Sequence, residues 1–456
     1  MFNVRQPWFD EIFTEDGALR PAYVALHRHT SQDLLRPSVS VAERLRERPL
    51  GDDTRILPIP VVIDDAEYRS IVQAGLIQRA RTLQRLFADL VLGRQRILSE
   101  GLGLDRALMG EVLAMHGTTL DNLRNLWQAG DRERIRFVYG PDLVRRADGR
   151  WVVLEDNVGC VGGTADSFFV ADRYQAALGP HAGLDCRPRP DLSNAVCRLL
   201  RRRERDDDRH GDAIGRAVAV LGCEADAGSW GFHLDENARC RQILSCVGIP
   251  VVDRQTLTGA RPGTVVNFDN DLSWSEVFSQ ASVAMLNAPG TGVLGNKALL
   301  PYLDDMIRFY TGEAPILPTP DTRLMADGVL PPDPENWVVK SAAGCQGTEV
   351  VVLGWQPQDR LREVARRACS EWAGAAAVLQ RYVEPSRLSP AGPGGWDSYR
   401  VEIRPIAYVL GWDDVYPGEQ PVGKAVSSYD VRRLNNVSRG ACYAPVLREP
   451  CPWCER

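Results

Sequence analysis

The chain has 456 residues, of which 44% are hydrophobic and 25% are charged, and its formal net charge is −6. This length predicts two or three domains, and the acidic balance argues against a dominant nucleic-acid or anionic-membrane surface, although a local basic patch stays open. No stretch approaches the roughly 18 apolar residues of a spanning helix, and the N-terminus lacks a basic segment followed by an apolar core. We therefore expect a cytoplasmic protein.

Residues 1–130 are predicted to be mainly helical. Apolar residues recur at three- and four-residue spacing over residues 66–93, and Asp64 and Asp65 are helix-start signals. The preceding residues 56–65 contain two prolines and are typical of a short extended segment.

Residues 131–195 begin with a hairpin signal and continue into a helix from about residue 164. Asp142 and Glu155 flank a glycine turn, so both are expected near one end of the strand pair. Asn157 follows Glu155 by two residues and shares its face, whereas Asp156 faces the other way. Two carboxylates and an amide oxygen suit a nucleotide-bound Mg²⁺. The alternative is a polar strand end in solvent.

Residues 196–285 predict a small parallel α/β domain. A charge run at 201–213 is typical of a solvated helix end or loop. An apolar strand at 217–226, a helix at 236–248 and a strand at 249–253 then form a βαβ pattern, and residues 266–280 add a further strand and helix.

Residues 286–456 contain mostly strand signals and few long helices, apart from a helix predicted at 296–310. A strand–turn–strand pattern at 337–354 places Lys340 at a strand end before a turn that contains Ser341, Gly344 and Gly347. Backbone N–H groups of such a turn can close over phosphates while the lysine neutralises them. An ordinary hairpin is the alternative.

Lysine is rare in this chain. Among 54 lysine and arginine residues only Lys297, Lys340 and Lys424 are lysines. A compact ammonium suits single phosphate oxygens better than a guanidinium fork, so these positions are candidates for phosphate contacts rather than surface charge. Residues 379–385 are an apolar strand whose backbone could face an adenine, or simply a strand.

Eleven cysteines are scattered along the chain, several of them inside apolar runs. An odd, scattered set is typical of reduced thiols rather than of a secreted disulfide framework. The only CxxC, Cys451 and Cys454, would need two further ligands, such as Cys442 and a histidine, to hold zinc. We interpret the pair as ordinary thiols, with zinc as the minor alternative.

Taken together, these stretches resemble the circularly permuted ATP-grasp proteins related to glutathionylspermidine synthetase. The order of the elements is specific to the permuted form, because the metal ligands precede the lysines. The resemblance lies in residues 8–23, 56–98, 142–157, 286–303 and 338–347.

The resemblance implies an α+β or α/β fold. In it residues 131–195 supply metal ligands, 286–456 complete the ATP-binding core, and a helical part (1–130) and a small α/β domain (196–285) flank them. Asp142, Glu155 and Asn157 would hold Mg²⁺. The ATP-binding residues would be Lys297, Lys340, Ser341, Gly344 and Gly347 at the phosphates, with Gln380 to Tyr382 as the adenine hinge.

Two segments depart from the family pattern. The loop after the metal ligands is about two residues longer, although Arg173 is retained, and Val426 stands where the family tends to have an arginine. Lys424, on the same strand face, is expected to supply that charge, and Arg404 keeps its family position. Arg173, Arg404 and Lys424 are therefore the candidate catalytic residues at the acyl site.

The sequence thus predicts an ATP- and Mg²⁺-dependent ligase that activates a small carboxylate, such as an amino acid or peptide, as an acyl phosphate and condenses it with an amine. Two alternatives are a degenerate ATP-grasp module that binds nucleotide or a partner without ligation, and an ATP-dependent phosphotransferase. No nucleic-acid or membrane partner is expected. The sequence leaves the two substrates and the oligomeric state open.

Overall fold

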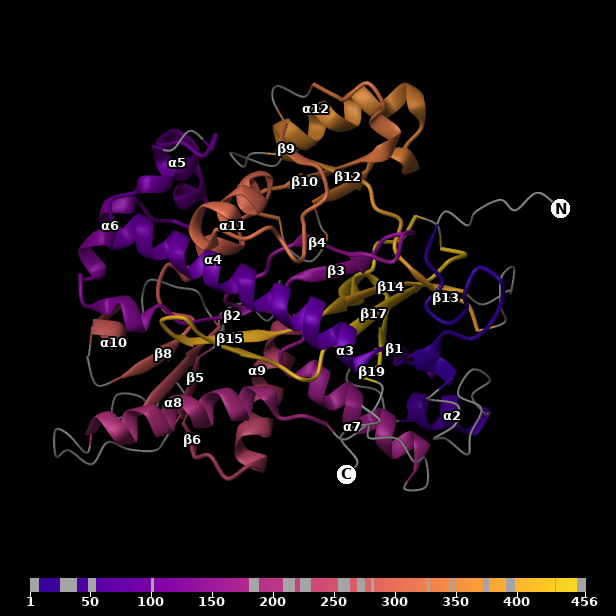
Figure 1. Ribbon diagram of the computed structural model, residues 1–456, viewed down its shortest axis with the longest axis horizontal. Helices are drawn as coiled ribbons and strands as arrows, with labels where there is room; N and C mark the ends of the chain where they lie inside the picture. The colour runs from indigo at the N-terminus through magenta and orange to yellow at the C-terminus, as the bar shows by residue number, and fades with distance from the viewer. Residues whose placement is uncertain are drawn as a thin grey trace.

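A computed structural model of the chain describes most of its residues. They are 8–24, 39–47, 55–99, 102–179, 188–207, 218–221, 231–252, 263–268, 275–279, 283–325, 329–344, 347, 349–371, 377–390, 398–430 and 432–448. Within these ranges the strands form five sheets, with helices around and between them (Figure 1). Cys451 and Cys454 lie outside the described residues, so their prediction is not addressed.

Helices dominate the first 130 residues, as their apolar spacing predicts. Asp64 accepts a hydrogen bond from the Glu67 N–H at 2.8 Å and so caps the helical run that follows. Helix α4 buries a stripe that includes Leu76, Leu83 and Phe87. The elements are α2 (Val39–Glu47), β1 (Val61–Ile63), α3 (Asp65–Glu67), the π-helical η1 (Tyr68–Gln73), α4 (Ala74–Val91), η2 (Arg96–Leu98), α5 (Arg106–Met115), α6 (Leu120–Leu126) and η3 (Asp131–Arg134).

A six-stranded sheet joins the predicted hairpin to strands from the end of the chain. Its order is β18-β17-β14-β3-β4, with β13 beside β14. The hairpin prediction is confirmed, because β3 and β4 are antiparallel and Asp142 lies opposite Glu155. Ile403 pairs with Leu143 and so connects the two halves. The strands are β3 (Asp142–Arg145), β4 (Trp151–Glu155), β13 (Arg387–Leu388), β14 (Tyr399–Arg404), β17 (Val422–Ser427) and β18 (Cys442–Ala444).

A four-stranded antiparallel sheet, in the order β11-β10-β12-β9, forms a separate lobe with helix α12 on its outer face (Figure 1). Its side chains make their own small core, which includes Trp337, Val339 and Leu361. The hairpin predicted at 337–354 is confirmed by the pairing of β10 with β11. The elements are β9 (Thr322–Leu324), η7 (Pro334–Asn336), β10 (Trp337–Ser341), β11 (Val350–Val352), η8 (Leu353–Trp355), η9 (Gln358–Arg360), α12 (Leu361–Glu371) and β12 (Ala377–Arg381).

A parallel sheet, in the order β6-β5-β7-β8, is built from the middle of the chain, as the βαβ pattern predicts. Residues 201–207 of the predicted charge run form the end of α8, and residues 208–213 lie outside the described residues. The elements are α7 (Asp166–Leu178), α8 (Asp191–Asp207), β5 (Val218–Leu221), α9 (Gly231–Cys246), β6 (Val251–Val252), β7 (Thr264–Asn267), α10 (Ser275–Ser279) and β8 (Ala284–Leu286).

The helix predicted at residues 296–310 is divided into a 3-10 segment and an α-helix. Asn296 caps the 3-10 segment by accepting the Ala298 N–H at 3.0 Å. Pro301 lies inside it and has no N–H for an α-helical ladder, so regular helix begins only beyond it, at Leu303. The elements are η5 (Thr291–Gly295), η6 (Lys297–Tyr302) and α11 (Leu303–Thr311).

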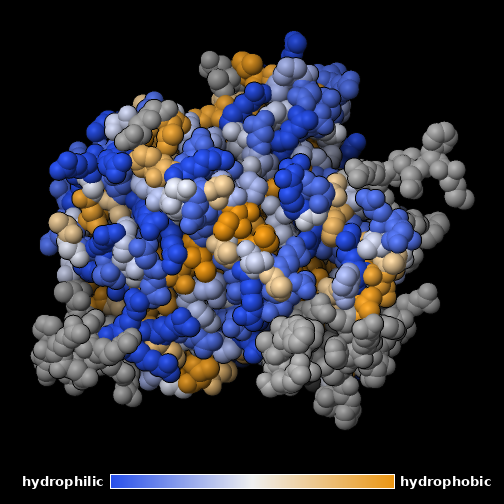
Figure 2. Space-filling view, in the orientation of Figure 1, coloured by the Kyte–Doolittle hydropathy of each residue, from blue (hydrophilic) through white to orange (hydrophobic). Residues whose placement is uncertain are grey.

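Two small sheets join strands from the first part of the chain to strands from the last, in the orders β1-β19 and β16-β15-β2. Strand β1 pairs in parallel with β19, and α4 packs against β15, β16 and α11. The remaining elements are β2 (Phe137–Tyr139), β15 (Ala407–Gly411), β16 (Asp414–Pro417), η10 (Val437–Arg439) and β19 (Val446–Arg448). In the described part of the chain, no helix has the length and apolar character needed to cross a bilayer. The face in Figure 2 is mostly hydrophilic, with small separate apolar patches among the coloured residues.

Candidate active site

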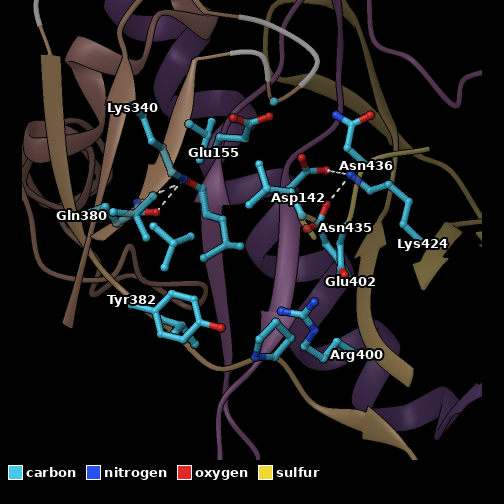
Figure 3. Close-up of a pocket in the computed structure, with 18 of the residues that line it drawn as sticks. Asp142, Glu155, Lys340, Gln380, Tyr382, Arg400, Glu402, Lys424, Asn435 and Asn436 are labelled. Atoms are coloured by element: carbon cyan, nitrogen blue, oxygen red, sulfur yellow. Dashed lines mark hydrogen bonds and ion pairs between the residues drawn. The ribbon is translucent and has the colours of Figure 1, made fainter. Parts of the chain in front are cut away.

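A pocket lies between the four-stranded lobe and the six-stranded sheet (Figure 3). All three lysines of the chain line it, although they come from η6, β10 and β17. Each lysine is at least nine-tenths buried. The other predicted site residues that line the pocket are Asp142, Glu155, Gly344, Gly347, Gln380 and Tyr382.

Lys340 is held by neutral groups on one wall of the pocket. Its Nζ donates to the Gln380 Oε1 at 2.7 Å and to the Leu154 carbonyl at 3.1 Å. Gln380 is itself fixed, because its Nε2 donates to the same carbonyl and to the Thr322 hydroxyl, each at 3.1 Å. Burial lowers the pKa of Lys340. No described carboxylate forms an ion pair with this ammonium, so its charge is available to an incoming anion.

The opposite wall carries a compensated cluster of four charged side chains. Arg404 donates to both oxygens of Asp142 at 2.6 and 2.7 Å, and the Lys424 Nζ lies 3.0 Å from the same carboxylate. Lys424 also forms an ion pair with Glu402. Burial alone would raise the pKa of Asp142, but Arg404 and Lys424 outweigh it and hold that pKa below its ordinary value. Burial and the nearby Asp142 charge raise the pKa of Glu402 to about 7.

Glu155 and Asn157 lie at the end of β4, near the glycine turn. The Glu155 Oε2 is 3.4 Å from the Lys297 Nζ, and that ammonium also donates to the Gly344 carbonyl. Asn157 does not line the pocket; its Nδ2 donates to the Gly140 carbonyl at 3.1 Å. The Asn157 amide is therefore bonded to the backbone just before β3, whereas Asp142 and Glu155 line the pocket.

Asp156 faces away from the pocket, as strand periodicity predicts. It accepts hydrogen bonds from Arg79 at 2.7 and 3.0 Å and a further one from the Tyr139 hydroxyl. Arg79 is fully buried in α4, so this pair fixes the strand end that carries Glu155 to the helix behind it.

The glycine turn is described only in part, since residues 345, 346 and 348 lie outside the described ranges. Its Ser341 N–H donates to the Glu349 carbonyl at 3.0 Å, and the buried Ser341 Oγ has no hydrogen-bond partner among the described residues. Gly347 has φ +65°, which a residue with a side chain rarely adopts.

In the expected adenine hinge, Gln380 to Tyr382, two backbone N–H groups donate to protein carbonyls. The Arg381 N–H donates to the Asp321 carbonyl and the Tyr382 N–H to the Asn336 carbonyl, each at 2.7 Å. The reason is that β12 is a central strand, flanked by β10 and β9. All three hinge residues line the pocket, as do Val383 and Pro385 directly after them, so the hinge stays a prediction.

Sequence reasoning missed Arg400 and Glu402, which line the pocket from β14. They share a strand face with Arg404, so period-two alternation could have revealed them. Arg400 lies opposite Val426 in the register with β17. Arg400 is therefore the cation directly opposite Val426, and the role expected of Lys424 stays a prediction.

The remaining catalytic candidates, Arg404 and Arg173, are not among the residues that line the pocket. All three nitrogens of the Arg404 guanidinium are used, since Nη1 donates to the Gly162 carbonyl at 2.8 Å. Arg404 therefore orients Asp142. Arg173, in α7, lies 3.9 Å from Asp172 and is not among the residues that line the pocket. Its proposed role remains a prediction.

The chain matches the family model described as circularly permuted ATP-grasp type 2, over residues 60–190 and 273–418. It belongs to this family. Membership implies ATP binding and agrees with the order of its elements, in which the hairpin that carries Asp142 and Glu155 precedes the lysines.

Curated relatives are distant. A Frankia casuarinae protein provisionally named glutamate–cysteine ligase 2-2 is 26% identical, over 81% of this chain and 46% of that protein. An uncharacterized Synechocystis protein is 27% identical, over 68% of this chain and 66% of that protein. The chain spans less than half the length of the Frankia relatives that it matches.

Among solved structures, a glutathione synthetase-like effector from Globodera pallida in apo form is similar in fold. It has a TM-score of 0.52 and 12% identity, and the similarity covers 94% of this chain and 98% of that one. At this identity the similarity concerns the fold alone.

Proposed function

We propose that this protein is an ATP- and Mg²⁺-dependent ligase that joins a small carboxylate to an amine. The observation that carries the proposal is that the chain's three lysines line one pocket together with Asp142 and Glu155. On this proposal, residues 131–195 and 286–456 build the ATP-binding core, and residues 196–285 form a smaller α/β unit beside it.

The nucleotide is proposed to lie along the pocket between its two walls. Adenine would face residues 383–385 and the apolar side chains of Val338 and Val352, which line the same end. The triphosphate would meet Lys297, Lys340 and the glycine turn. Lys340 supports this placement because its charge has no carboxylate partner among the described residues. A phosphate group would supply the missing negative charge.

The donor set at the hairpin fits Mg²⁺. Asp142 and Glu155 are cross-strand neighbours that both line the pocket, and a hard cation takes one or two carboxylates together with phosphates and waters. Among the described residues, no group of three or more acidic, histidine or cysteine side chains is placed to hold a metal ion. Asp142 and Glu155 would hold it, with Asn157 behind them, and when bound it would neutralise charge on the transferring phosphoryl group.

The proposed reaction has two balanced steps. A substrate carboxylate oxygen attacks the γ-phosphorus of ATP, the bond to the bridging oxygen breaks, and ADP leaves from an acyl phosphate. An amine then attacks the acyl carbon, the C–O bond breaks, and inorganic phosphate and a proton are released as the amide forms. Lys297 and Lys340 would stabilise charge on the phosphoryl oxygens. The glutamate–cysteine ligase name of the Frankia relative suggests amino-acid substrates as the first to test.

The acyl phosphate can be tested without knowing the amine. The protein is incubated with ATP, Mg²⁺, hydroxylamine and a panel of carboxylates that begins with L-glutamate, and hydroxamate is measured beside ADP. We expect stoichiometric hydroxamate and ADP for at least one carboxylate. ATP binding with neither product across the panel would favour the binding-module alternative. A phosphorylated product that hydroxylamine does not trap would favour phosphotransfer.

Substituting Glu155→Ala should abolish ATP turnover, because the pocket loses a carboxylate that no other described side chain replaces at the end of β4. Arg150→Ser, in the exposed turn of the same hairpin, is the matched control and should leave turnover unchanged. Equal turnover in the wild-type and E155A proteins would remove the metal assignment.

A further inference from the structure

Arg400 differs from the other cations of β14 and β17 in having no acidic partner among the described residues. Arg404 and Lys424 are paired with Asp142 and Glu402. Arg400 is only 5% exposed, yet its hydrogen bonds go to neutral groups: its Nη2 donates to the carbonyls of Asp430 and Arg433, each at 2.7 Å. Its buried Nε has no hydrogen-bond partner among the described residues. A buried, uncompensated charge is costly unless a ligand supplies the counter-charge.

The surroundings of Arg400 leave room for such a ligand. Val426, directly opposite on β17, is small and apolar. The centre of the guanidinium is 5.5 Å from the Trp355 ring, and the Tyr382 hydroxyl lies within hydrogen-bonding reach. Figure 3 shows Arg400 and Glu402 on one side of the pocket and Lys340 and Gln380 on the other.

Arg400 also connects the β14–β17 wall of the pocket to the segment that follows β17. By holding the carbonyls of Asp430 and Arg433 it fixes the backbone that carries Asn435 and Asn436 into the pocket. The same segment meets the glycine turn, since a Cβ added at Gly347 would lie 3.4 Å from the Leu434 Cδ1. An anion bound at Arg400 would therefore be enclosed by the β14–β17 wall, the segment that follows β17 and the glycine turn.

We infer that Arg400 is an oxyanion-binding residue of this pocket, on the wall opposite Lys340. The inference rests on the proposed function and extends it: beyond Lys297 and Lys340, a second anionic group is bound by a guanidinium. That group is either a nucleotide phosphate or the carboxylate of the acyl substrate, since both present oxygens that match a guanidinium.

Calorimetric titrations separate these sources from each other and from a purely structural role. Adenosine and ADP are titrated into the wild-type, R400M and R400K proteins, and L-glutamate is titrated in the presence of Mg²⁺ and a non-hydrolysable ATP analogue. Arg323→Met is the matched control. This arginine also lies over a tryptophan ring, but it is on the edge strand β9 and does not line the pocket. Loosening of the loop would weaken adenosine and ADP alike, whereas loss of an ionic contact would weaken only the anionic ligand.

If Arg400 binds a phosphate, R400M should reduce ADP affinity about 10- to 100-fold while adenosine changes less than about twofold, and R400K should recover part of the loss. If it binds the substrate, ADP affinity stays unchanged and glutamate affinity falls by a similar factor. Unchanged ADP affinity with no loss for glutamate would overturn the inference, as would equal weakening of adenosine and ADP. Failure of the wild-type protein to bind ADP would instead remove the nucleotide pocket itself, and this inference with it.

Discussion

The two walls of the pocket solve the burial of charge in different ways. On the β10–β12 wall, Lys340 donates to the Gln380 amide and the Leu154 carbonyl and forms no ion pair with a described carboxylate. On the β14–β17 wall, Lys424 and Arg404 are matched by Asp142 and Glu402. The first wall keeps a free charge for its ligand, while the second is close to neutral without one. Under the proposed function, the first wall would therefore be the one that attracts an anionic ligand.

Removing Lys424 should have the largest effect on stability. K424M removes the cation paired with Glu402 and one of the two cations paired with Asp142, while both carboxylates stay buried. Breaking a buried ion pair in this way typically lowers the free energy of unfolding by about 3–5 kcal/mol. Urea unfolding measures the change. The double variant K424M/E402Q leaves Arg404 to balance Asp142 and should recover much of the loss. If the double variant is no more stable than K424M, the two side chains are not coupled as described.

Removing Lys340 should have the opposite profile. K340M takes away a buried ammonium with no carboxylate partner among the described residues, so the free energy of unfolding should fall by less than about 1 kcal/mol. ATP turnover should fall about 100-fold or more, because phosphate loses its partner on this wall. The comparison of ADP release with urea unfolding checks both expectations. A stability loss as large as that of K424M would show that the two walls are alike.

The smallest expected effect is a pH dependence at Glu402. Its folded pKa of about 7 lies above the ordinary value of 4.5, so the folded state holds the proton more tightly. This group therefore makes the protein less stable as pH rises from about 4.5 to 7, and the penalty is constant above that range. E402Q removes the titration, so its Tm relative to wild type should rise between pH 5 and pH 8. Glu363→Gln on exposed α12 is the control, and a pH-independent difference for E402Q would contradict the assignment.

Local features of this molecule could be predicted from sequence. The hairpin around Gly149 and the capped helix after Asp64 each depend on neighbouring residues, so a single stretch carries the signal. The rarity of lysine identified three residues that share one pocket. Their convergence is a property of the fold, and only the resemblance suggested it beforehand.

Features that depend on strand pairing could not be predicted in this way. Gln380 was named only for its backbone in the adenine hinge, whereas its side chain orients Lys340 because β12 lies next to β10. Glu402 was overlooked because a carboxylate inside a strand signals nothing until its partner strand is known. The cross-strand register places it beside Lys424.

The pairing of β3 with β14 has a consequence for how the protein is made. Asp142 and Arg404 are 262 positions apart in the chain, and β1 waits still longer for its partner β19. Contacts of such long range form slowly, because a large loop must close before they contribute. During synthesis the β3–β4 hairpin therefore stays without its neighbouring strand until β14 has been made. Truncation before β14 would remove the strand that pairs with β3, and would leave that edge of the hairpin exposed and prone to aggregate.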